Sequence, residues 1–139
     1  MTAPVPATAA TTAGLRSLPV EPADGFPQSF LLGVDDRTYR IELYVDVPEH
    51  ALDPGADPRT PLDLVGSAER PAQGMLVGVV VRESADGSPV QLLRRRLLPG
   101  LVYVAAELVV VVDELRVAVG NLNGAGSFGS VLRARAGVR

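Results

Sequence analysis

The most constraining feature of this chain is the segment from Arg37 to Val47, in which apolar side chains alternate with charged and polar ones. Successive side chains of a β-strand point to opposite faces, so this alternation predicts a strand with one buried face. We expect the apolar set to enter the domain core and the other set to be available to neighbouring molecules. The two sets are Tyr39, Ile41, Leu43, Val45 and Val47, and Arg40, Glu42, Tyr44 and Asp46.

Further apolar, β-branched runs follow one another along the chain with turn signals between them. Asp86-Gly87 is a strong hairpin signal, because glycine accepts a positive φ without a steric penalty. The pattern predicts an all-β fold, a small antiparallel β-barrel or sandwich of about eight strands with little or no helix. The expected strands cover residues 29–34, 38–47, 74–82, 90–98, 101–105, 107–112, 115–119 and 130–138.

Residues 104–119 also contain Ala, Glu and Leu at positions that a helix could use. Seven of these residues are Val, however, and β-branched side chains lose rotamer freedom in a helix. We therefore favour two strands in this region, with a turn at Asp113-Glu114 between them.

The length of 139 residues is typical of one domain. Residues 1–28 are rich in Ala, Thr and Pro, which predicts an extended N-terminal arm that is either disordered or ordered by lying across a neighbouring subunit. Residues 29–139 form the expected β domain. Within it, residues 48–73 contain five prolines and are expected to form a long loop, which in a compact domain is usually functional or flexible.

Charge and composition bound the setting of the chain. All 13 basic residues are Arg, which indicates a high-GC genome, and there is no Cys for a disulfide or a thiolate metal site. Residues 1–87 hold 6 Arg and 13 acidic residues, whereas residues 88–139 hold 7 Arg and 3 acidic residues. This asymmetry favours pairing between the halves or between copies over a uniform field for nucleic acid.

Two further patterns argue against membranes and export. The nearly apolar region 97–119 is interrupted by four charged residues, so we expect no membrane insertion. The first residues carry neither a basic region nor a continuous apolar region, so they do not resemble a secretory signal.

The chain offers little material for catalysis. His50 is the only histidine and lies in the proline-rich loop, without a second His or a Cys to complete a metal site. No serine is surrounded by a nucleophile-elbow motif, and the glycine-rich segment 120–130 lacks the ending of a phosphate-binding loop. We expect no enzymatic activity, no metal, no cofactor, no small-molecule substrate and no specific nucleic acid.

Arg94, Arg95 and Arg96 form the densest basic cluster. On a strand the first and third would share one face, and each guanidinium must be solvated or paired with a carboxylate. One reading is an ion-pair cluster between subunits, and the other is an exposed edge blunted by charge. Because valine and leucine crowd several strands, we also expect an apolar face to be covered by a second copy or another protein.

Two segments resemble a known family. In "PQSFLLGVDDRTYRIELYV", Phe30 and Leu32 precede a turn and the apolar face of the next strand, and "VVVRESADGSPVQLLRRRLLPG" contains Asp86-Gly87 followed by Pro89. Both are similar to hairpins of the small all-β baseplate plug family of tailed bacteriophages and related contractile injection systems. The loop at 48–73 and the N-terminal arm depart from that pattern.

The resemblance implies a non-enzymatic structural subunit of a phage tail or tail-like assembly, acting as a plug or adaptor at the baseplate or tail tip. Its partners would be copies of itself and other tail proteins, and its place the virion, or otherwise the cytoplasm. The alternative is a soluble β-barrel binding module for a small molecule or a peptide, with a concave apolar pocket.

Overall fold

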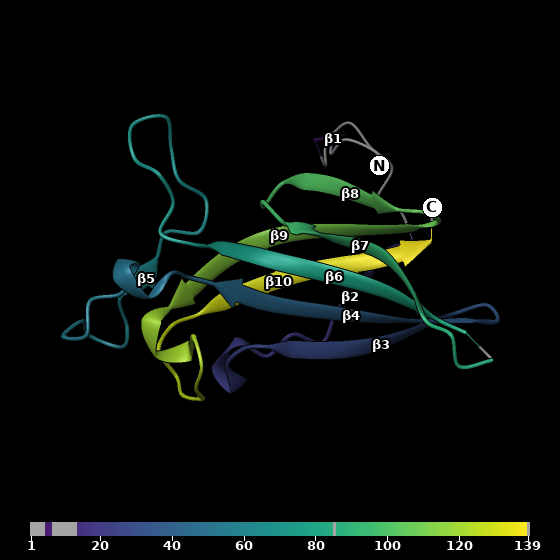
Figure 1. The fold of residues 1–139 in the computed structure, drawn as a ribbon, viewed down its shortest axis with the longest axis horizontal. Helices are drawn as coiled ribbons and strands as arrows, with labels where there is room; N and C mark the ends of the chain where they lie inside the picture. The colour runs from purple at the N-terminus through teal and green to yellow at the C-terminus, as the bar shows by residue number, and fades with distance from the viewer. Residues whose placement is uncertain (1–4, 7–13, 85, 139) are drawn as a thin grey trace.

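Two antiparallel sheets pack face to face in the computed structural model, which describes residues 5–6, 14–84 and 86–138 (Figure 1). No strand pairing among the described residues joins the two sheets into a closed ring. The all-β expectation is therefore confirmed, and the architecture is a sandwich.

The first sheet has four strands in the order β3-β4-β6-β7. These strands are β3 (Gln28–Val34), β4 (Arg37–Asp46), β6 (Met75–Glu83) and β7 (Val90–Arg96). Both hairpins expected in this region are confirmed, since β3 pairs with β4 and β6 pairs with β7. Gly87 lies in the second turn with φ of 84°, the left-handed conformation that glycine adopts readily.

The second sheet has six strands in the described part of the chain. Its long strands are β8 (Leu101–Ala105), β9 (Leu108–Ala118) and β10 (Val131–Val138). Three two-residue strands complete it, namely β1 (Val5–Pro6) on β8, β2 (Arg16–Ser17) on β10 and β5 (Pro61–Leu62) on β9. Short 3-10 helices lie in the connections: η1 (Pro22–Asp24), η2 (Glu49–Ala51) and η3 (Val119–Asn121).

The expected turn at Asp113-Glu114 is wrong. β9 continues through these residues, and Asp113 is an extra residue between the pairs Val112–Ala134 and Glu114–Arg133. Such a bulge bends a strand without ending it, so the acidic pair marks a kink instead of a reversal. Asp113 accepts two hydrogen bonds from Arg135 of β10, at 2.7 and 2.8 Å, which fasten the bulge. The helical alternative for residues 104–119 is also excluded, because β8 and β9 occupy most of this region.

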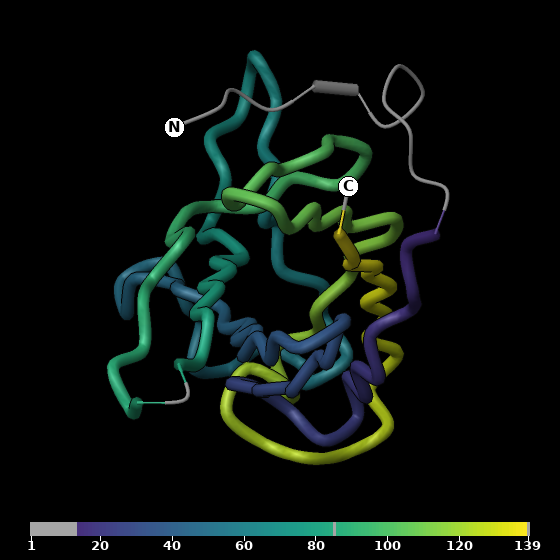
Figure 2. Tube along the Cα trace, turned by 90° about the vertical axis from the view of Figure 1, so that its right-hand side faces the viewer, coloured from purple at the N-terminus to yellow at the C-terminus, as the bar shows by residue number. Residues whose placement is uncertain are grey.

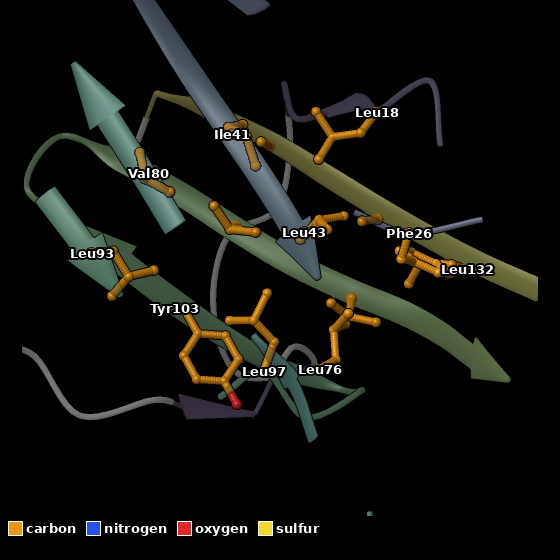
Figure 3. Close-up of a cluster of buried hydrophobic side chains, with 14 of the residues drawn as sticks. Leu18, Phe26, Ile41, Leu43, Leu76, Val80, Leu93, Leu97, Tyr103 and Leu132 are labelled. Carbon is orange, nitrogen blue, oxygen red and sulfur yellow. The ribbon is translucent and has the colours of Figure 1, made fainter. Parts of the chain in front are cut away.

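The core lies between the sheets. Figure 3 shows side chains of both sheets pointing toward one another, with Phe26 and Leu18 of the N-terminal segment among them. The alternation of β4 is confirmed, because Tyr39, Ile41 and Leu43 are fully buried and Val45 packs at the border of the core.

The crowded valines are buried within the chain itself, so covering by a second copy or another protein is not needed to remove them from water. Val102, Val109 and Val111 form a smaller buried cluster with Leu15 of the N-terminal segment packed near them. In the described part of the chain, the exposed large hydrophobic residues are scattered: Leu31, Val65, Met75, Val90 and Val138.

Part of the segment expected to be an arm is fastened to the domain. Leu18 donates its N–H to the carbonyl of Ala134 at 2.8 Å, and the chain from Gly14 runs beside β10 (Figure 2). Residues 1–4 and 7–13 of the expected arm lie outside the described residues. The proline-rich segment 48–73 forms two excursions at one end of the sandwich, anchored where Leu62 and Leu64 are buried (Figure 1).

Candidate interaction surface

The outer face of the four-stranded sheet carries most of the residues that the sequence singled out as interface candidates. Residues directly opposite each other in neighbouring strands lie on one face. The register therefore places Glu42, Val79 and Arg94 in one row across the sheet, and Tyr44, Val77 and Arg96 in the next row. Arg40 and Asp46 occupy the same face of β4, whereas Arg95 lies on the opposite face of β7.

Tyr44 and Arg94 form a pair on this face, near the end of β4. Arg94 donates a hydrogen bond from Nη2 to the Tyr44 hydroxyl at 2.8 Å, and its guanidinium carbon lies 5.7 Å from the centre of the ring. This geometry combines a hydrogen bond with a cation–π contact. Val77 and Val79 beneath the pair are buried, so the outer surface consists of an aromatic ring and charged groups over a valine strip.

The other arginines of the cluster have partners that the sequence did not predict. Arg96 donates from Nη2 to the carbonyl oxygens of Leu64 and Val65, at 2.9 and 3.1 Å. Arg95 lies over the ring of Tyr103 at 5.0 Å. A guanidinium donates well to carbonyl oxygens and stacks on aromatic faces, in addition to the expected pairing with solvent or carboxylates.

Arg96 holds the base of a projecting loop beside this face. Asp63 begins the loop and accepts hydrogen bonds from the N–H groups of Gly66 and Val65, at 2.8 and 3.2 Å. These two bonds hold the pKa of the Asp63 carboxyl below its ordinary value. At the other end of the loop, Gln73 donates its N–H to the Asp63 carbonyl at 2.7 Å. The loop is therefore closed on itself and fixed to β7.

A cleft of about 410 Å³ borders the same face. β3 pairs with β4 only as far as Leu43, whereas β4 continues to Asp46. The cleft lies at this end of β3 and combines apolar walls with charged groups of the interface row. Its lining comes from three separate segments: Phe26, Pro27, Glu42, Tyr44, Val45, Arg94, Leu122 and Asn123. Residues 26–27 and 122–123 could not be predicted as part of this cleft, because only the tertiary fold brings them to β4.

A second polar cluster, also missed in the sequence, joins the two sheets at the opposite end. Glu107, in the turn between β8 and β9, accepts a hydrogen bond from the Tyr39 hydroxyl. Arg82 lies 3.1 Å from both carboxylate oxygens of Glu107, and Arg37 lies 3.1 Å from one of them. The hydrogen bond from Tyr39 is the largest influence on this carboxyl, and together with Arg82 it outweighs burial and lowers the pKa of Glu107 from 4.5 to about 2.

We predict that Glu107 contributes stability that depends on pH. Its pKa is lower in the folded chain, so its contribution is present above about pH 4.5 and is lost as the pH falls toward about 2. Glu107→Gln is expected to lower the free energy of unfolding at neutral pH by about 1 to 3 kcal/mol, since Tyr39 and Arg82 lose a charged acceptor. The free energy of unfolding of Glu107→Gln should also vary less with pH between about 4.5 and 2 than that of the wild-type chain.

Urea unfolding followed by circular dichroism at several pH values measures both effects. Glu69→Gln, at an exposed position of the proline-rich segment, is the control and should unfold as the wild-type chain does. Equal acid sensitivity of the wild-type chain and Glu107→Gln would show that the cluster does not couple folding to pH.

The structure adds little to the remaining chemical candidates. His50 is exposed in η2, and no group of three or more His, Asp or Glu residues within the described ranges could hold a metal ion. Among these same residues there is no helix long and apolar enough to cross a membrane.

Comparisons with protein-family models, with curated proteins and with solved structures found no match for this chain.

Proposed function

We propose that this chain is a non-enzymatic structural subunit of a phage tail or tail-like assembly, placed in the virion as a plug or adaptor near the baseplate or tail tip. Its partners are copies of itself and other tail proteins. The observation that carries the proposal is the Tyr44–Arg94 pair on the outer face of the four-stranded sheet, together with the hairpin resemblance of β3–β4 and β6–β7.

The composition of this face suits a protein partner. Tyr and Arg are enriched where protein interfaces concentrate their binding energy. Here the two side chains already hold each other in one arrangement, so less conformational entropy is lost when a partner covers them. The Arg40–Glu83 ion pair at 3.0 Å lies farther along the same sheet and supplies a polar rim.

The cleft beside Tyr44 favours a second candidate function, a binding module for a peptide or a small molecule. Its volume falls within the ordinary range of ligand sites, and apolar Phe26, Pro27 and Leu122 stand opposite charged Glu42 and Arg94. An extended peptide would fit best, because β4 continues past the end of β3 and has no partner strand on that side among the described residues.

The proposed function is tested by sedimenting tail-like particles from lysates of the source bacterium and probing the fractions for this chain. We expect the wild-type chain to sediment with intact tails. Tyr44→Ala should lower its incorporation about tenfold or more, as expected for the loss of a central interface tyrosine. His50→Ala, at an exposed position in η2 outside the strands of this face, is the matched control and should be incorporated normally.

Thermal unfolding of each variant separates a lost contact from a lost fold. A wild-type chain that stays in the soluble fraction while tails sediment without it would contradict the structural role. In that case, binding of extended peptides that is lost in Tyr44→Ala would support the binding module.

A further inference from the structure

The exposed edges of the two sheets are protected unequally. An unprotected edge strand offers its free N–H and C=O groups to another chain, and proteins block such edges with charge, proline, bulges or short covering strands. In the six-stranded sheet, the two-residue strands β1 and β2 cover part of the edges of β8 and β10. In the four-stranded sheet, β7 follows Pro89, contains a bulge opposite Val80 and Val81 and carries three arginines.

The sequence of β3 itself contains none of these devices. Its sequence from Gln28 to Val34 contains no charge and no proline, and its seven pairs with β4 run without a register shift. It forms the other edge of the four-stranded sheet, and no described strand pairs with its outer side. Leu31, the middle residue, is 69% exposed, the largest exposed fraction among the large hydrophobic residues that the structure describes as exposed.

The backbone of β3 also points in the direction that pairing requires. Arg16, which belongs to the second sheet, donates from Nη2 to the carbonyl of Gly33 at 2.6 Å, so this carbonyl points away from β4. In an antiparallel ladder the N–H and C=O groups of alternate residues point toward the partner and away from it. The groups of Ser29 and Leu31 therefore also point outward, and the Gly33 carbonyl keeps a second lone pair for a further donor.

We propose that β3 is the surface through which a second copy of this chain binds. The two β3 strands run antiparallel about a two-fold axis at Leu31 and join the four-stranded sheets of both copies into one sheet of eight strands. This interface is isologous, because the same residues meet from both sides. The inference rests on the proposed function in that it names the contact by which copies of the chain associate.

The sequence of β3 is compatible with antiparallel pairing to a second copy of itself. With Leu31 opposite Leu31, Phe30 faces Leu32 and Ser29 faces Gly33. No like charges meet at any of these positions, and apolar residues face apolar residues near the centre. A foreign partner would need to supply this complement, whereas a second copy supplies it without further requirement.

The test is light scattering coupled to size-exclusion chromatography of the purified full-length chain over a range of concentrations. We expect a dimer of twice 14.6 kDa that dissociates on dilution. Leu31→Lys places two like charges opposite each other on the axis and should weaken the dimer about tenfold or more. Val90→Lys, at an exposed position on the edge strand β7, is the matched control and should leave dissociation unchanged.

Amide hydrogen exchange supplies a second readout that requires no substitution. The N–H groups of Ser29 and Leu31 should exchange more slowly as the protein concentration rises. A monomer at every concentration, or association that Leu31→Lys leaves intact, would overturn the inference. Either result would leave open whether the chain sediments with tails. Conversely, a chain that does not sediment with tails could still form the β3 dimer. The two experiments therefore test the two proposals independently.

Discussion

Leu43→Asp is expected to prevent the chain from folding. Leu43 is 0% exposed and lies on the core face of β4, where it pairs across the sheet with Gln28 and Gly78. A carboxylate at this position would have neither water nor a partner charge, and its burial should cost about 4 kcal/mol or more. The lost packing of Leu43 adds about 2 to 5 kcal/mol. The combined cost is comparable with the whole stability of a small domain, about 5 to 15 kcal/mol.

Far-ultraviolet circular dichroism and urea unfolding measure this effect. Leu31→Asp, one strand away and 69% exposed, is the matched control and should change the free energy of unfolding by about 0.5 kcal/mol or less when measured on dilute protein. If Leu43→Asp unfolded at the same urea concentration as Leu31→Asp, the assignment of the inner face of β4 would be wrong.

Asn121→Ala is expected to destabilise the chain by about 2 to 4 kcal/mol. Asn121 is fully buried, and its Nδ2 donates to the carbonyls of Gly124 and Gly126 at 3.2 and 2.9 Å. Its Oδ1 accepts from the Ser130 hydroxyl at 2.7 Å, and that hydroxyl accepts from the N–H of Ala118. The alanine variant would leave the two carbonyls and the Ser130 hydroxyl, all partly buried, without this partner.

The same unfolding measurement tests this network. Asn123→Ala removes an exposed amide from the same connection between β9 and β10, so its effect should be small. Similar midpoints for the two alanine variants would mean that water replaces the lost hydrogen bonds and that Asn121 does not organise the connection.

The fold was predictable where local chemistry determines it. The period of two in β4 and the turn at Asp86-Gly87 are properties of neighbouring residues, and both were predicted. The error at Asp113-Glu114 has a physical reason, since an acidic pair is compatible with a turn or with a bulge. Arg135 of β10 selects the bulge, and it lies 22 residues away in sequence.

The candidate surface was predictable only in part. Alternation placed Arg40, Glu42, Tyr44 and Asp46 on the outer face of β4 without a structure. Partners could not be assigned in this way, because Tyr39 and its acceptor Glu107 are 68 residues apart. The crowded valines are buried within the chain itself, so association with a second copy or another protein stays a prediction that their burial does not test.

The proposed role in a tail can be checked by immunogold electron microscopy of tail-like particles from the organism that carries the gene. Antibodies raised against this chain should label intact tails, with the gold concentrated at the tip and absent from particles of a strain in which the gene is deleted. Tails that remain unlabelled, while the chain is abundant in the particle-free fraction, would contradict a structural role in the tail.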